Sequence, residues 1–286
     1  MVNSKIIHIR SQDAIKYDDN SNYISFALSE PIVVSEKQEI IVQVLNCSIP
    51  YSFYNVNYIN KYLDIKENND IFTMIFEEGN YSAVQFAHTL ENLLNQNSPN
   101  NCNYSVSYNK FTNKMIISIS TANVMVSFLF LSGENSKYDC QYILGFYKKQ
   151  DYSFNSLNNL VSDSAVNVSP YEAIYIQSNL GITNQYATNS KNLSNILIKI
   201  PITSTPFSYI NWENKTENLR YKSYLTTIQT ITLSLNDADG DLIDILNANW
   251  YMTVMFQIVE KNDYFILPRD DLVKVKILDD QNNENV

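Results

Sequence analysis

The feature that most constrains this chain is a hydrophobic alternation with a period of two residues, which recurs along most of its length. Successive side chains of a strand point to opposite faces of the sheet, so this period is typical of half-buried β-strands. At least eight runs follow it, around residues 24–28, 40–44, 71–75, 115–119, 174–176, 196–202, 231–235 and 250–258. The sequence therefore predicts an all-β protein.

One long segment, residues 82–96, departs from this period. Its apolar residues recur at the spacing of one helix face, and Ser82 is a residue type that caps helix N-termini. The apolar positions are Val84, Phe86, Ala87, Leu90, Leu93 and Leu94. The pattern predicts a single amphipathic helix. Because helices and strands do not alternate regularly, a parallel doubly wound sheet is excluded, and a sandwich, jelly roll or barrel is favoured.

Scarce residue types exclude several kinds of chemistry. The five glycines lie too far apart for the glycine-rich phosphate loops and for the G-x-S-x-G nucleophile motif. Cys47, Cys102 and Cys140 are odd in number and widely spaced, while His8 and His88 have no partner at metal-ligand spacing. We therefore expect no enzymatic activity, and no catalytic, cofactor-binding or metal-binding residue.

The acidic stretch at residues 236–241, with Asp244 beyond it, is the one candidate cation site. With Gly240 at the sixth position of a calcium loop, Leu235 would take the first and Leu246 the twelfth, and neither side chain is a ligand. Asp-Gly between two strand-like runs is typical of a tight turn. We predict a turn here.

Charge and hydropathy limit the partners. The 30 acidic and 20 basic residues give a net charge of −10, which argues against direct nucleic-acid binding. The longest apolar stretch, residues 124–131, is too short to span a bilayer, and residues 1–13 do not resemble a signal peptide. We expect a soluble, unsecreted protein.

Aromatic side chains gather in two places: Tyr51, Phe53, Tyr54 and Tyr58 follow one strand run, and Phe207, Tyr209 and Trp212 follow another. Core packing is one interpretation. Subunit contacts are a second, because large aromatic side chains are enriched at interfaces, and stacking on sugars is a third.

Four stretches of the chain, taken in order, resemble the penton (minor capsid) proteins of virophages and polinton-like DNA viruses. They are EGNY at residues 78–81; YNKFTNK at 108–114 with LGF at 144–146; IYIQSNL at 174–180 with LIKIPI at 197–202; and SLND at 234–237 through LID at 242–244 to Trp250. The resemblance covers roughly residues 70–260, and the first 60 residues match only in strand character.

This resemblance implies a single jelly roll, five copies of which form a non-enzymatic capsomer at each fivefold vertex of an icosahedral capsid. It also implies an insertion within the jelly roll. We expect residues 1–59 to hold an N-terminal arm, over residues 1 to about 20, and the first strands of the jelly roll. An inserted α+β segment follows at 60–165, then the remaining strands at 166–270 and an acidic tail at 271–286. A separate N-terminal domain before a C-terminal jelly roll fits the periodicity nearly as well.

The implied partners are four further copies of the chain and the major capsid protein of the same virus. The implied location is the virion, after assembly in the host cytoplasm. We expect the ring contact at Pro206, Phe207 and Trp212, because a proline-interrupted aromatic segment between strands indicates a loop. Three other functions stay open: a virion fibre or cement protein, a jelly-roll carbohydrate-binding module, and a hydrolase on a β-sandwich.

Overall fold

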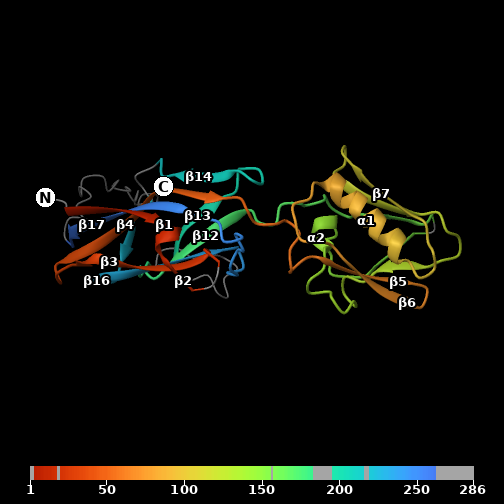
Figure 1. Ribbon diagram of the computed structural model, residues 1–286, viewed down its shortest axis with the longest axis horizontal. Helices are drawn as coiled ribbons and strands as arrows, with labels where there is room; N and C mark the ends of the chain where they lie inside the picture. The colour runs from red at the N-terminus through yellow and green to blue at the C-terminus, as the bar shows by residue number, and fades with distance from the viewer. Residues whose placement is uncertain (1–2, 18–19, 156, 183–194, 216–218, 262–286) are drawn as a thin grey trace, which may run out of the picture.

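A computed structural model describes residues 3–17, 20–155, 157–182, 195–215 and 219–261. They form two lobes placed end to end along the long axis of the molecule (Figure 1). One lobe holds the two ends of the described chain in two packed sheets, and the other holds its middle part with the main helix.

The first lobe is an antiparallel sandwich. One sheet has the order β1 (Asn3–Arg10), β17 (Tyr251–Glu260), β4 (Gln38–Pro50) and β14 (Tyr209–Glu213), with β15 (Tyr221–Ser223) also paired to β4. The other has the order β13 (Ile196–Pro201), β12 (Ala173–Ser178), β16 (Thr227–Asn236), β3 (Tyr23–Val33) and β2 (Ile15–Lys16). A short 3-10 helix, η1 (Ser11–Asp13), follows β1.

In this lobe, strands near one end of the described chain pair with strands near the other end, and strands closer to the middle of the chain pair with each other. Strand β1 pairs with β17, β3 with β16, β4 with β14, and β12 with β13. A chain folded back on itself in this way, with its pairs shared between two sheets, is a jelly roll. The predicted fold class is confirmed: an all-β single jelly roll with an α+β segment that carries one amphipathic helix.

The jelly-roll core follows from the period-two pattern. In β4, Val42 and Val44 turn inward and lie opposite Phe256 and Val254 of β17. The largest buried side chain is Trp250, which is fully enclosed and donates its indole Nε1–H to the Ser21 carbonyl at 2.8 Å. All the fully buried members of this core come from residues 9–53 and 174–256.

The second lobe has two small sheets and two helices. One sheet has the order β10 (Tyr152–Ser153), β9 (Val126–Phe128), β5 (Tyr62–Glu67) and β6 (Asp70–Ile75). The other has the order β11 (Asn159–Val161), β8 (Lys114–Ile119) and β7 (Tyr104–Asn109), and the helices are α1 (Ala83–Asn97) and α2 (Gln141–Leu144). Its core is a second cluster, drawn from residues 56–160.

Helix α1 confirms the helix predicted at residues 82–96. Ser82 is its N-cap: the Ser82 hydroxyl accepts from the Gln85 backbone N–H, and the Gln85 side chain accepts from the Ser82 N–H. This reciprocal pair satisfies two of the backbone donors that a helix start leaves open. Phe86, Leu90 and other apolar side chains bury one face, while His88 is exposed on the other.

The second core lies, in sequence, between β4 and β12 of the jelly roll, so the chain leaves the first lobe once and returns to it once. Residues 3–10, within the segment where an N-terminal arm was expected, form β1, whose eight residues pair with Tyr251–Ile258 of β17. The acidic tail expected at residues 271–286 lies outside the described residues. The boundaries at residues 59, 165 and 270 stay a prediction.

Candidate functional site

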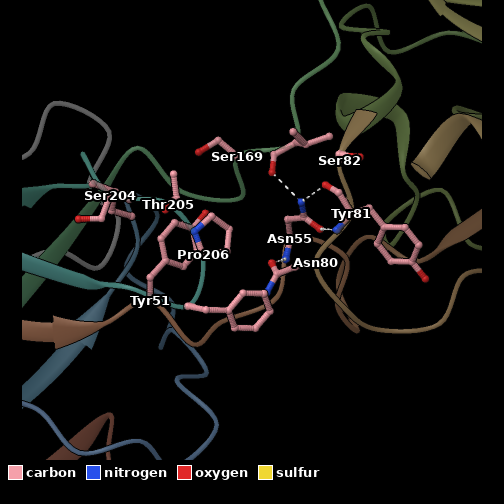
Figure 2. Close-up of a pocket in the computed structure, with 12 residues that line it drawn as sticks. Tyr51, Asn55, Asn80, Tyr81, Ser82, Ser169, Ser204, Thr205 and Pro206 are labelled. Carbon is pink, nitrogen blue, oxygen red and sulfur yellow. Dashed lines mark hydrogen bonds between the residues drawn. The ribbon is translucent and has the colours of Figure 1, made fainter. Parts of the chain in front are cut away.

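A cavity of about 430 Å³ lies where the two lobes meet. Four segments that are far apart in sequence form it, as Figure 2 shows. They are Tyr51 and Asn55 after β4, residues 80–82 before α1, Val168 and Ser169 on the return to the jelly roll, and Ile202 with residues 204–207 between β13 and β14. Jelly-roll residues give the cavity its aromatic and apolar walls, and the other segments give it mostly amides and hydroxyls.

Asn55 ties the two connections between the lobes together. This side chain is only 4% exposed; its Oδ1 accepts from the Tyr81 N–H at 2.9 Å, and its Nδ2 donates to the carbonyls of Tyr81 and Val168. The Asn55 backbone N–H donates to Asn80 Oδ1 at 3.1 Å. Every polar atom of this buried amide is paired. These hydrogen bonds hold the two connecting segments in a fixed position relative to each other.

Phe207 lies at the rim of this cavity in an unusual conformation. Its φ is 66°, in the left-handed region that bulky residues rarely adopt, and its side chain is 82% exposed. The Phe207 N–H donates to the Tyr51 carbonyl at 3.0 Å, and the Tyr51 N–H donates to the Ser208 carbonyl at 2.8 Å. A strained, exposed aromatic residue that backbone bonds hold in place is a candidate binding residue.

The structure brings two of the three expected contact residues together. Pro206 and Phe207 both line the cavity. Trp212 does not: it lies on β14 opposite Cys47, half-buried against the jelly-roll core. The other aromatic cluster is divided, because Tyr51 and Phe53 are buried and stacked with ring centroids 4.2 Å apart, whereas Tyr58 is exposed.

The lining of the cavity is uncharged, since all twelve of its residues are neutral types. One polar atom in it has no partner: Asn80 Nδ2 is buried and donates to nothing. Such an unpaired buried donor is costly unless an acceptor reaches it. Sequence reasoning missed Asn55, which lies in no motif, and gave no binding role to Asn80, although Asn80 belongs to the EGNY stretch. Only the fold brings both beside the loop between β13 and β14.

The titratable groups singled out in the sequence lie elsewhere. Cys47, Cys102 and Cys140 are free and buried, and burial raises the pKa of each thiol, most strongly for Cys47 and Cys140. A buried thiol with a raised pKa is a poor nucleophile. His8 is exposed, with Nδ1 at 3.1 Å from Thr253 Oγ1.

The acidic stretch forms the predicted turn. Asp237 Oδ1 accepts from the backbone N–H groups of Asp239 and Asp241, at 2.9 and 3.0 Å, and burial raises the pKa of the Asp237 carboxyl. Among the residues that the structure describes, no group of three or more His, Cys, Asp or Glu side chains is placed to hold a metal ion. In the same residues, no helix combines the length and hydropathy needed to cross a membrane.

Comparison with known proteins gives a structural match. No family model matches the chain, and no curated protein matches its sequence. The crystal structure of selenomethionine-labelled mavirus penton protein matches 90% of this chain and 100% of that chain, with a TM-score of 0.50 and 13% sequence identity. This chain shares the fold of that penton protein. Since 90% of the chain is matched, the likeness spans both lobes and not the jelly roll alone.

Proposed function

We propose that this protein is a structural penton protein, which forms homopentameric capsomers at the fivefold vertices of an icosahedral virus capsid. The observation that carries the proposal is the fold shared with mavirus penton protein over the whole of that chain. The four sequence stretches that resemble pentons of virophages and polinton-like viruses also support it. These stretches fall in both lobes, so the resemblance is not confined to the jelly roll.

Closure of a five-membered ring requires a heterologous contact, in which one patch of each copy docks onto a different patch of the next. Aromatic side chains suit such contacts because they bury a large area at little cost in rotamer entropy. Phe207, Tyr224 and Phe111 are each more than 60% exposed on this protein. We place the ring contact at the β13–β14 loop with Pro206 and Phe207, and extend it along β14 to Trp212.

The proposal divides the chain at residues 59, 165 and 270, with residues 60–165 inserted in the jelly roll. The proposed partners are the neighbouring copies and the major capsid protein of the same virus, and the proposed location is the virion after assembly in the host cytoplasm. At a net charge of −10 per copy, direct contact with packaged nucleic acid is unfavourable.

The test is the mass of the purified protein in solution, measured by light scattering over a series of concentrations. A closed species near five times 33.0 kDa is expected. A trimer would favour the fibre or cement function instead. A monomer at every concentration, both alone and mixed with the major capsid protein, would contradict the proposal.

A further inference from the structure

We propose that neighbouring copies in the ring are joined by insertion of the β7–β8 turn of one copy into the cavity between the lobes of the next. Phe111 is the inserted side chain, and the cavity beside Phe207 receives it. The inference rests on the proposed penton function, and it identifies the two surfaces that meet between neighbouring copies.

The β7–β8 turn presents an apolar side chain on an ordered support. Phe111 is 99% exposed, more than any other large apolar residue among those the structure describes. Asn109 Oδ1 accepts from the N–H groups of Phe111 and Thr112, at 2.9 and 3.2 Å, and the Tyr108 hydroxyl donates to Asn113 Oδ1 at 2.8 Å. The ordered turn keeps the aromatic ring exposed to water. Burying this ring against a partner would therefore be favourable.

The β7–β8 turn is bonded to the same connecting segment that lines the cavity, near the junction of the lobes. Strand β7 begins beside the C-terminal end of α1, where the Tyr104 N–H donates to Asn95 Oδ1, and runs back toward the end of the helix that adjoins the cavity. The Val166 N–H donates to the Asn113 carbonyl at 2.7 Å, so the turn is tied to the segment that returns to the jelly roll. A rotation about an axis parallel to the long axis keeps both at one height, as a ring contact requires.

Charge favours this pairing between copies of an acidic chain. The stretch between Glu91 and Glu134 contains no carboxylate and carries Lys110 and Lys114, although the whole protein has a net charge of −10. The cavity itself is lined only by uncharged residue types. A basic turn that approaches a neutral cavity avoids like-charge repulsion.

The volume and the aromatic lining of the cavity suit an inserted phenylalanine side chain. A volume of about 430 Å³ is in the range that accepts a small organic ligand, so it admits an aromatic side chain with part of its backbone. Tyr51 and Phe207 supply aromatic faces for the incoming ring.

A cysteine cross-link tests the contact directly, because the three native cysteines are buried. Phe111→Cys and Thr205→Cys place one thiol on the turn and one at the cavity. Under mild oxidation, a mixture of the two single variants is expected to give a covalent dimer, and neither variant alone should cross-link, since the contact is heterologous. The double variant is expected to give a covalent five-subunit ring.

Two matched controls sharpen the experiment. Leu157 is 77% exposed on the same lobe, so Leu157→Cys mixed with Thr205→Cys should give no cross-link. Phe111→Asp should raise the concentration needed for ring formation by about tenfold or more. Leu157→Asp should leave that concentration unchanged, and the α1 circular dichroism signal should stay the same in both variants because both side chains are exposed.

The outcomes separate the inference from the function on which it rests. A five-subunit species that forms without a cross-link between positions 111 and 205, or that tolerates Phe111→Asp, would overturn the inference and leave the penton function standing. A wild-type protein that forms no five-subunit species would contradict the penton function, and the inference with it.

Discussion

The two lobes build their cores from different material and from different parts of the chain. The jelly-roll core is mainly aliphatic and joins residues 9–53 to residues 174–256. The second lobe, called the inserted lobe below because its core lies in sequence between β4 and β12, closes its core within residues 56–160. Contacts between aromatic rings form a chain in this core, from Tyr104 through Phe154, Phe128, Phe130 and Phe146 to Tyr152. One lobe therefore depends on contacts between distant segments, and the other on a contiguous one.

This difference implies that the inserted lobe forms its core sooner and independently, because closing a short loop costs less entropy than joining the two ends of the chain. The two lobes also have separate signals. Both tryptophans, Trp212 and Trp250, belong to the jelly-roll lobe, whereas the long helix α1 belongs to the inserted lobe. Tryptophan fluorescence and helical circular dichroism then follow the two lobes separately.

The largest effect is expected from emptying either core. Trp250→Ala should destabilise the jelly-roll lobe by about 3–5 kcal/mol, since it removes the largest buried side chain and leaves a cavity. Phe128→Ala should cost the inserted lobe about the same. Urea unfolding should show the first variant shifting the fluorescence of Trp212 and the second shifting the helical signal. If either variant moves both signals equally, the lobes are one cooperative unit.

A smaller effect is expected at the junction. Asn55→Ala removes the amide that pairs Tyr81 with Val168, and should cost about 1–3 kcal/mol because these backbone groups lose buried partners. The fluorescence and helical transitions should move apart in this variant. The matched control is Asn103→Ala, at an exposed position beside the start of β7, whose transitions should stay as in the wild type. Coincident transitions in Asn55→Ala would show that other contacts couple the lobes.

The N-cap of α1 offers a milder change confined to one lobe. Ser82→Ala removes the hydroxyl that accepts from the Gln85 N–H and should lower the stability of the inserted lobe by about 1 kcal/mol. Ser82→Asp keeps an acceptor at the same place and should restore it. A loss in the fluorescence transition equal to that in the helical transition would contradict the separation of the lobes.

A separate expected effect is a pH dependence in the inserted lobe. Burial raises the pKa of Asp139 from 3.8 to about 6, against a backbone hydrogen bond from Gln141 that lowers it. The folded state therefore disfavours the carboxylate: the cost is absent below pH 3.8, grows as the pH rises toward 6, and is complete above it. Asp139→Asn should flatten the stability profile between pH 3.8 and about pH 6 relative to wild type. Parallel profiles would contradict this assignment.

The elements of the fold followed from local pattern. Strand runs such as residues 115–119 and 231–235 alternate because one face is buried, and residues 82–96 carry a helical period and a capping serine. The strand character of the first residues was visible in the sequence, but the pairing of β1 with β17 was not, because partners at opposite ends of the chain leave no local signal.

The candidate site was only partly predictable. Pro206 and Phe207 carry the local signal of an aromatic loop, and both lie at the cavity. Asn55 and Asn80 carry no such signal, since an asparagine becomes a junction residue only when the fold brings distant backbone groups to it. The exposure of Phe111 is likewise a property of the folded turn, because sequence alone does not distinguish a buried phenylalanine from an exposed one.

Electron microscopy of the purified protein tests the central claim most directly. The account predicts closed particles with fivefold symmetry and two tiers, one for each lobe, joined by contacts at the level of the cavity between the lobes. Particles with threefold symmetry, or single copies that never close into a ring even beside the major capsid protein, would contradict it.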